Sequence, residues 1–444
     1  MPANGLTATA STSAAGPDPV RERGCVPWSE ARHIAFGSAG PLPPVAVPLA
    51  EAVGRTLTRD VTARQDLPHY ASSAMDGWAV NGPGPWLLAG PGQHVPPPTA
   101  ADRFLPANSA AVIATGGLVP HGADAVLRKE SGLATRDPNG NHVLTLRPDA
   151  KPGEPGAGQH IRPAGQEARS GEVLLPAGTV LNPAHVALAA AAGHDTLELR
   201  ARAAVAVVLT GAEVVTQGLP VPGQVRDTFG PQLGNVVSLL GGVAGSPQRI
   251  GDSFGEWLDA LDGTATSQGG CADVIITTGG TGKSGTDHFR TAVDALGGQL
   301  LVDGIAMRPG HPAVLAGLPD GRFVIGLPGN PLAAMMAMLT LGAPLLASLG
   351  GGDLPPMHLV MSGCDIEGDK GRTRLLPCRF LSGLAFPVQH AGPGMMRGLA
   401  WADAVMAVPP QGVESGEPIT VLPLPWTTRA ETITMPPGQG RNTE

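Results

Sequence analysis

The sequence contains few of the residues that mark zinc sites, disulfide frameworks or nucleic-acid surfaces. Its four cysteines are scattered, with no C-x-x-C pair among them, so neither a zinc site nor a set of disulfide bonds is expected. The net charge is −8, without a run of lysine and arginine, which argues against nucleic-acid binding. An anionic ligand would therefore have to be bound by local features. The scattered thiols fit a cytoplasmic protein.

The N-terminal segment lacks an apolar stretch long enough for a signal peptide or a membrane span. Residues 1–26 are instead small and polar, with scattered Pro and Gly. We therefore expect this segment to be disordered and residues 427–444 to form a tail. No membrane partner is expected.

Aromatic residues make up only 3% of the chain, whereas 63 Gly and 46 Pro together form about a quarter of it, near the level at which disorder becomes a concern. Most of these Gly and Pro residues separate apolar segments, and the hydrophobic content of 42% is enough for packed cores. A chain of 444 residues exceeds what one core usually supports. We therefore expect about two to four domains.

A segment rich in Thr and Gly follows a predicted buried strand. The apolar run at residues 274–276 is typical of a strand that is covered on both faces of a parallel sheet. Residues 277–282 carry no bulky side chain, so the backbone can turn tightly and offer N–H groups to an anion. A helix predicted from Phe289 adds partial positive charge at its N-terminus. The predicted ligand-binding residues are Thr278, Gly279, Gly280, Thr281 and Gly282.

A second strand, turn and helix follow at residues 322–350. The strand is predicted to end at Leu327, and the helix from Leu332 is expected to be broken by Gly342 and Pro344. Asn330 fits a helix N-cap and Pro331 the first helical residue. Pro328, Gly329 and Asn330 are candidate ligand-binding residues, although capping alone would also explain them.

Strands and helices alternate from about residue 201, which predicts a parallel α/β sheet. Ligands of such sheets gather at the carboxyl ends of the strands, where the loops 210–213, 277–287 and 326–330 would meet. Two of these loops carry an acid, Glu213 and Asp287. A pair of carboxylates beside a phosphate loop suits a magnesium ion, although Asp287 could also be a helix N-cap.

The TTGGTG and GLPGNP segments together resemble the molybdopterin-binding fold of molybdenum cofactor assembly proteins. With SAMDG at residues 73–77, the chain from Trp28 to Trp426 resembles the molybdopterin molybdenumtransferase family, which includes the E domain of gephyrin. This resemblance implies a multidomain α/β plus β fold. Its parts would be an elongated N-terminal domain (27–67 and 158–200), an inserted β domain (68–157), a three-layer α/β/α molybdopterin-binding domain (201–350) and a C-terminal β barrel (351–426).

The resemblance also implies an activity, the insertion of molybdate into adenylated molybdopterin with release of AMP. Magnesium would assist, and the protein would be a homodimer in which the SAMDG segment faces the partner's cleft. Asp76 matches an acid of the active site and would be catalytic together with Glu213 and Asp287. Thr115 and Glu130 match residues that line the cleft. Without the resemblance, Asp76 would be interpreted as an ordinary turn residue.

The candidate molybdate ligands are Arg308, His311 and Arg372. His311 stands where the family has a lysine, and a neutral imidazole would bind an oxyanion poorly. If His311 is a ligand, molybdate affinity should rise as the pH falls. An equally good interpretation makes His311 a surface turn residue.

Other positions also depart from the family pattern. Pro393 replaces a serine, Gln166 replaces an acid, and Ala212 is a further departure. These departures suggest an alternative function, a catalytically inactive molybdopterin-binding paralogue that serves as a scaffold or stores the cofactor. A pterin adenylyltransferase on the same ligand fold is a third hypothesis, disfavoured by the additional β domains.

Overall fold

The computed structural model of the protein divides into two compact units. Residues 44–200 form one unit, and the residues before 44 form the other together with those after 200. The structure describes residues 25–88, 104–263, 271–282 and 288–427. The N-terminus expected to be disordered, up to residue 24, the tail from residue 428 and Asp287 lie outside the described residues.

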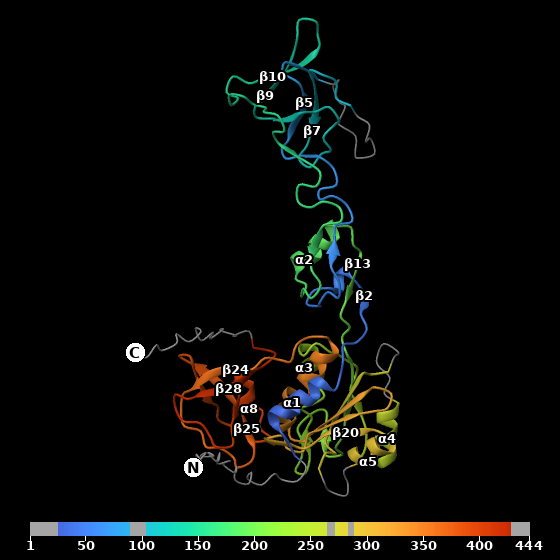
Figure 1. Cartoon of the computed structure of the whole chain (residues 1–444), viewed down its shortest axis with the longest axis vertical. Coiled ribbons are helices and arrows are strands. Elements are labelled where there is room, and N and C mark those ends of the chain that lie inside the picture. Colours follow the sequence, from blue (N-terminus) through green and yellow to red (C-terminus); the bar gives the residue numbers. More distant parts are fainter. Residues whose placement is uncertain (1–24, 89–103, 264–270, 283–287, 428–444) are drawn as a thin grey trace, which may run out of the picture. The chain divides into compact units, whose positions relative to one another are not determined.

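A six-stranded sheet forms a large part of the unit 44–200 (Figure 1). Its strand order is β8-β5-β7-β6-β10-β9. The strands are β5 (Gly77–Asn81), β6 (Trp86–Leu88), β7 (Ser109–Ile113), β8 (Ala125–Arg128), β9 (Gly132–Arg136) and β10 (His142–Leu146). Val80, Trp86, Leu127 and Leu144 are buried together on one face, so this sheet has a hydrophobic core of its own.

Short antiparallel strand pairs and one helix, α2 (Pro183–Ala191), form the rest of this unit. The pairs are β2 (Val45–Pro48) with β13 (Thr196–Leu199), β3 (Val61–Thr62) with β12 (Val173–Leu175), and β4 (Ser72–Ser73) with β11 (Ile161–Arg162). A single 3-10 turn, η1 (Leu49–Glu51), follows β2. Because Val45 pairs with Leu199, the two ends of the unit lie side by side.

The other unit contains a sheet with the order β17-β14-β19-β23-β22-β20. As predicted, β14 (Ala204–Leu209), β19 (Val274–Thr278) and β23 (Phe323–Leu327) are parallel neighbours. The sheet is nevertheless mixed, because β22 (Val314–Gly317) runs antiparallel to both of its neighbours, β23 and β20 (Gln299–Asp303). The few residues between β22 and β23 can form a hairpin but not a parallel crossover.

Two short strands extend this sheet beyond β14. They are β17 (Val243–Ala244) and β18 (Gln248–Arg249), and both pair with β14 in parallel. β18 pairs at the carboxyl end of β14, where Arg249 lies opposite Leu209.

Helices cover both faces of the sheet (Figure 1). They are α1 (Trp28–Gly37), α3 (Leu233–Leu239), α4 (Phe254–Asp262), α5 (Phe289–Ala295) and a long helix over residues 331–349. α4 and α5 pack with Ile275 on one face. α1, α3 and the long helix pack with Ile276 on the other. Successive residues of β19 are thus buried on opposite faces, which explains its uninterrupted apolar sequence.

The long helix is continuous, which corrects the expected break at Gly342 and Pro344. It consists of α6 (Pro331–Ala337), a π-helical turn η2 (Met338–Gly342) and α7 (Ala343–Leu349). A π turn shifts the backbone hydrogen-bond register by one residue. This shift accommodates a proline, which lacks the N–H that a regular helix would require.

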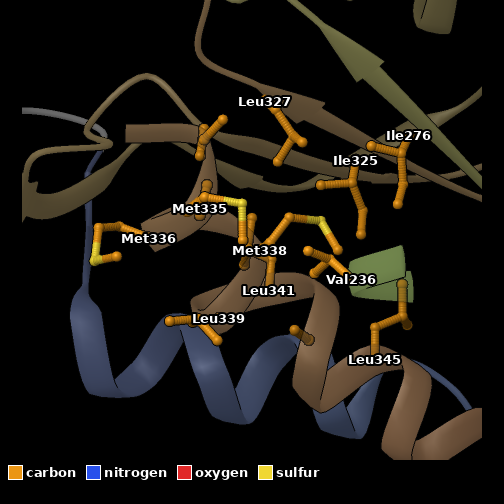
Figure 2. Packing of buried hydrophobic residues seen from close by; sticks show 14 of the residues in the cluster. Val236, Ile276, Ile325, Leu327, Met335, Met336, Met338, Leu339, Leu341 and Leu345 are labelled. Atoms are coloured by element: carbon orange, nitrogen blue, oxygen red, sulfur yellow. The ribbon is translucent and has the colours of Figure 1, made fainter. Parts of the chain in front are cut away.

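This helix is the core element of the unit. Figure 2 shows Met335, Met338 and Leu341 lying against the strand that carries Ile325 and Leu327. The helix Pro331–Leu349 is long and apolar enough to cross a membrane, but 94% of its most apolar window is buried inside the protein. Its hydrophobicity is therefore accounted for by packing.

The N-terminal helix α1 is joined to the π turn by buried polar contacts. Trp28 Nε1 donates to Thr340 Oγ1 at 3.1 Å. Arg32 donates from Nη1 to the carbonyl of Leu339 at 3.2 Å and from Nη2 to the carbonyl of Pro355 at 2.7 Å. Arg32 is only 1% exposed, and burial lowers the pKa of its guanidinium. These contacts fix α1 to the core helix.

The last strands form a closed five-stranded barrel, as predicted. The strands are β24 (His358–Ser362), β25 (Thr373–Leu381), β26 (Leu384–Pro387), β27 (Ala404–Val408) and β28 (Pro418–Pro423). The barrel closes because β25 pairs with both β26 and β27. β21 (Ile305–Arg308) joins the barrel beside β25 and also pairs with β1 (Val26–Pro27). A short helix, α8 (Arg397–Ala400), precedes β27.

Candidate functional site

A cleft of about 710 Å³ lies at the carboxyl ends of the three parallel strands β14, β19 and β23. The loops that follow these strands all line it, as the sequence predicted. Six of the predicted site residues line the cleft, namely Glu213, Thr278, Gly279, Gly280, Gly329 and Asn330. The structure thus brings the TTGGTG and GLPGNP segments together.

The turn after β19 depends on two glycines. Gly279 and Gly280 have φ values of 73° and 67°, a region that side chains strongly disfavour. A Cβ atom on Gly280 would also lie 2.5 Å from Cζ2 of Trp257. The hydroxyl of Thr210 donates to the carbonyl of Thr278, so the loops after β14 and β19 are tied to each other at the floor of the cleft.

The end of the TTGGTG segment has a structural role. The side chain of Thr281 is buried and packs against Gly326. The carbonyls of Thr281 and Gly282 both accept hydrogen bonds of 2.9 Å from Arg290 Nη1. Arg290 in turn forms an ion pair with Asp303. Thr281 and Gly282 therefore hold the loop in place and are not among the residues that line the cleft.

The GLPGNP turn is capped differently from the prediction. Pro331 is the first helical residue, as expected, and Asn330 occupies the N-cap position, but its side chain makes no capping hydrogen bond. The carbonyl of Pro393 instead accepts from the N–H groups of Leu332 and Ala333, at 2.9 and 3.2 Å. Because Asn330 is released from capping, its exposed side chain is available to a ligand. Pro328 is buried beneath this turn.

The acids expected to bind magnesium are only partly described. Glu213 is exposed in the cleft, with its carboxylate close to Gly211. Asp287 lies outside the described residues, so the structure gives no geometry for the pair. The described ranges contain no group of three His, Cys, Asp or Glu side chains that could hold a metal ion.

Sequence reasoning missed an ion pair in this cleft, formed by Asp227 and Arg249. Asp227 follows β16 (Val225–Arg226), which pairs with β15 (Val214–Val215). Its Oδ1 accepts from the backbone N–H groups of Phe229 and Gly230, both at 3.0 Å. The sequence signal was weak, an Asp before Thr-Phe-Gly that suits a turn.

A smaller pocket of about 370 Å³ lies between β21, β25 and the loop 391–393. It is lined by Arg308, which was predicted, and by Arg374, which was not. Arg308 Nη1 lies 3.4 Å from Asp369 Oδ2, and Arg374 donates to the carbonyl of Glu367. The two arginines are paired residues of parallel strands, so their side chains share one face of the sheet.

The other two predicted molybdate ligands do not line this pocket. The Nδ1 atom of His311 lies 2.9 Å from the carbonyl oxygen of Ile305, and the ring contacts Cys25 Sγ at 3.9 Å. This geometry fits the interpretation of His311 as a turn residue. Arg372 ends a turn in which its N–H donates to the carbonyl of Asp369 at 3.0 Å.

In the unit 44–200, the structure brings Asp76 and Thr115 into direct contact. Asp76 Oδ1 accepts from the backbone N–H and the hydroxyl of Thr115, at 2.7 and 2.9 Å. These bonds, with a smaller contribution from Lys129, lower the pKa of Asp76. Gly77 is required beside it, since a Cβ there would lie 2.0 Å from the carbonyl oxygen of Leu127. Glu130, the residue after Lys129, is exposed.

The departures from the family pattern fall at different places. Ala212 and Gln166 are both exposed. Pro393 lines the small pocket, and its carbonyl caps α6. Only Pro393 therefore has a structural role that its contacts define.

Three family models match successive parts of the chain. Residues 26–193 match the MoeA N-terminal region (domain I and II). Residues 206–348 match a probable molybdopterin binding domain, and residues 360–424 match the MoeA C-terminal region (domain IV).

Curated relatives extend over most of the chain. A molybdopterin molybdenumtransferase of Nostoc is 30% identical over 409 residues, which cover 85% of this chain and 88% of that relative. Molybdopterin molybdenumtransferase 2 of Mycobacterium tuberculosis is 30% identical over 389 residues, covering 84% and 92%. The crystal structure of a molybdopterin biosynthesis protein from Pyrococcus horikoshii has the same fold, with a TM-score of 0.66 at 24% identity over 90% of this chain and 99% of that one. The chain therefore belongs to the molybdopterin molybdenumtransferase family, as the sequence motifs predicted.

Proposed function

We propose that the protein inserts molybdate into adenylated molybdopterin and releases AMP. The observation that carries this proposal is the position of the small pocket that contains Arg308 and Arg374 beside the large cleft. Residues 391–393 line the small pocket, and Gly394, the next residue, lines the cleft. One loop thus separates a site for an oxyanion from a site for a larger ligand.

The large cleft is the proposed site of the nucleotide-bearing pterin. Its volume of about 710 Å³ is in the range of pockets that bind small molecules. Gly280 and Gly329 leave its walls free of side chains, and Thr278 and Asn330 contribute polar groups. Such walls allow close approach of a phosphate to the backbone.

The small pocket is the proposed molybdate site. Arg308 and Arg374 keep their charge at all physiological pH values and can grip an oxyanion with paired N–H groups. Paired like charges on adjacent strands are unfavourable on their own, and a bound dianion would relieve their repulsion. Asp369 and Glu367 also line the pocket and limit its net charge. Arg372 and His311 would then act outside it.

In the proposed reaction, water attacks the phosphoanhydride of the adenylated pterin and AMP leaves. The two dithiolene thiols of molybdopterin then bind the molybdenum, and one molybdate oxygen leaves with the two thiol protons as water. The protein's contribution would be positioning and electrostatics. Asp76, oriented by Thr115, is proposed to enter the active site of a partner subunit in a homodimer, in agreement with the sequence-based expectation.

Both carboxylate oxygens of Asp227 already accept hydrogen bonds from protein groups. Two other carboxylates of the cleft, Glu213 and Asp252, are exposed. Together with ligand phosphates they would suit a magnesium ion, and Asp287, the other predicted ligand, lies outside the described residues. No step of the proposed reaction is routed through a metal.

A binding protein without turnover is the alternative, motivated by Pro393, Ala212, Gln166 and His311. One experiment separates the two functions. The purified protein is incubated with adenylated molybdopterin and molybdate, with and without magnesium, and AMP is measured over time. Molybdate-dependent release of AMP supports the transferase. Tight binding of the pterin nucleotide without release would establish the binding protein instead.

A further inference from the structure

Arg249 occupies a position in the large cleft at which a ligand phosphate would be expected. It is the last residue of β18 and lies opposite Leu209, the last residue of β14. The next residues along the chain, Thr210 and Gly211, line the cleft with it. The backbone of Arg249 therefore stands at the carboxyl end of the sheet, the edge where ligands of this architecture bind.

The guanidinium of Arg249 is held in place by Asp227. Arg249 Nη2 donates to Asp227 Oδ2, while Asp227 Oδ1 accepts from the N–H groups of Phe229 and Gly230. The Asp227 side chain is only 9% exposed, whereas the Arg249 side chain is 35% exposed. The carboxylate is thus enclosed by its partners, and the arginine faces the cleft.

The loop that carries Asp227 has a glycine, Gly230, directly beside the ion pair. A Cβ atom on Gly230 would lie 2.3 Å from Asp227 Oδ2 and 3.4 Å from Arg249 Nη2. Any larger residue would displace the carboxylate from the arginine. The ion pair and the absence of a side chain at residue 230 therefore depend on each other.

The remaining chemistry of Arg249 suits a phosphate. A guanidinium carries five N–H donors in a planar fork, and Asp227 is the only hydrogen-bond partner of Arg249 in the described part of the chain. The other donors remain for a ligand, and an arginine binds a phosphate through two parallel hydrogen bonds. Arg226 adds a second positive charge to the cleft, against the exposed carboxylates of Glu213 and Asp252.

We infer that Arg249, oriented by Asp227, binds a phosphate group of the pterin nucleotide. This inference rests on the proposed function for the identity of the ligand. The Asp227–Arg249 ion pair would then have a role in ligand binding in addition to stabilising the loop between β16 and α3. A purely structural ion pair would stabilise the fold but leave ligand affinity unchanged.

The test is calorimetric titration of the full chain with AMP, in buffer containing EDTA and again with magnesium. Adenosine serves as the ligand without a phosphate. The variants are Arg249→Gln, Arg249→Lys and, as the matched control, Arg379→Gln, which removes an exposed arginine that does not line the cleft. The melting temperature of each variant shows whether it is folded, and Arg249→Lys keeps the test valid if Arg249→Gln unfolds.

We expect AMP to bind in EDTA and Arg249→Gln to weaken it by about tenfold or more, because a charge-assisted pair of hydrogen bonds is lost. Arg249→Lys should be intermediate, Arg379→Gln should stay within about twofold of the wild type, and adenosine affinity should not change. Equal AMP affinity in the wild type and both Arg249 variants, in both buffers, would overturn the inference. Phosphate-dependent binding through Arg249 without molybdate-dependent AMP release would instead overturn the proposed function alone.

Discussion

The carboxylate of Asp76 accepts two hydrogen bonds from one residue, Thr115, through the backbone N–H and the hydroxyl. The two residues are brought together by the pairing of β5 with β7, in which Gly77 lies opposite Ile113. The sequence motifs marked both as site residues but gave no sign that they touch. Their contact means that Thr115 controls the orientation and the charge of Asp76.

Thr115→Val should raise the pKa of Asp76. The backbone N–H bond, which lowers the pKa most, remains in this variant, but the hydroxyl bond is lost. A carboxyl with a depressed pKa adds stability above its ordinary value of 3.8, and that stability is lost as the pH falls through the folded value. In the variant this loss should therefore be smaller and should be complete at a higher pH. Carbon NMR titration of the Asp76 carboxyl measures the shift, and an unchanged titration would show that the hydroxyl does not donate.

Asp76→Asn should lower AMP release while the fold is retained. The side chain is at the surface, so its replacement by an isosteric amide should leave the melting temperature nearly unchanged. Loss of the charge should nevertheless reduce the rate by at least about tenfold if the carboxylate orients a reacting group. AMP release and thermal unfolding are measured on the same preparation. A large drop in melting temperature with normal turnover would identify Asp76 as an ordinary turn residue.

Molybdate affinity should be independent of pH between pH 6 and 8. Guanidinium groups stay charged throughout this range, and Arg308 and Arg374 line the small pocket, whereas His311 is turned toward Ile305. Arg374→Gln should weaken molybdate binding by about tenfold. His311→Lys should leave the pH profile flat. Calorimetric titration with molybdate at several pH values checks these expectations.

The control for this experiment is Arg379→Gln, which removes an exposed arginine from the same strand outside the small pocket. It should bind molybdate like the wild type. A wild-type affinity that rises as the pH falls, with the slope abolished in His311→Lys, would place the imidazole in the anion site after all.

Cys378 should be the least reactive of the thiols. It is fully buried in the barrel, and burial, with a contribution from the charge of Asp403, raises its pKa to about 12. Since the thiolate is the reactive form, alkylation at pH 8 should label exposed Cys271 rapidly and leave Cys378 unmodified until the protein unfolds. Peptide mass spectrometry measures both. Equal rates in the native protein would mean that the barrel opens readily.

The parts of the fold that follow from local patterns were predicted correctly. The apolar run at 274–276 specified a strand covered on both faces, and four of the five barrel strands have recognisable extended sequences, β26 being the exception. The reversed strand β22 was missed because its direction depends on a hairpin and on pairing with β23 and β20. The π turn was missed because a proline within a helical sequence normally predicts a helix break. In the structure, Pro344 lies in α7, directly after the π turn, and the helix continues through it.

The site shows the same limit. Loops that end parallel strands could be predicted because Thr, Gly and Asn mark them in the sequence. The pairs Asp227–Arg249 and Arg308–Arg374 could not, since each depends on two segments that meet only in the folded protein. His311 was predicted because it stands where the family has a lysine. Strand register, which sequence patterns do not give, places Arg374 beside Arg308.

The contact between Trp28 and Thr340 has a consequence for the synthesis of the chain. These residues are 312 positions apart, so a ribosome that adds roughly 5–20 residues per second completes the partner of α1 roughly 15–60 s after α1 itself. The strands of the unit 44–200, including the pair β2 and β13, are all translated within that interval. Helix α1, with the indole of Trp28 and the guanidinium of Arg32, must therefore remain unpaired on the nascent chain until the core helix has emerged.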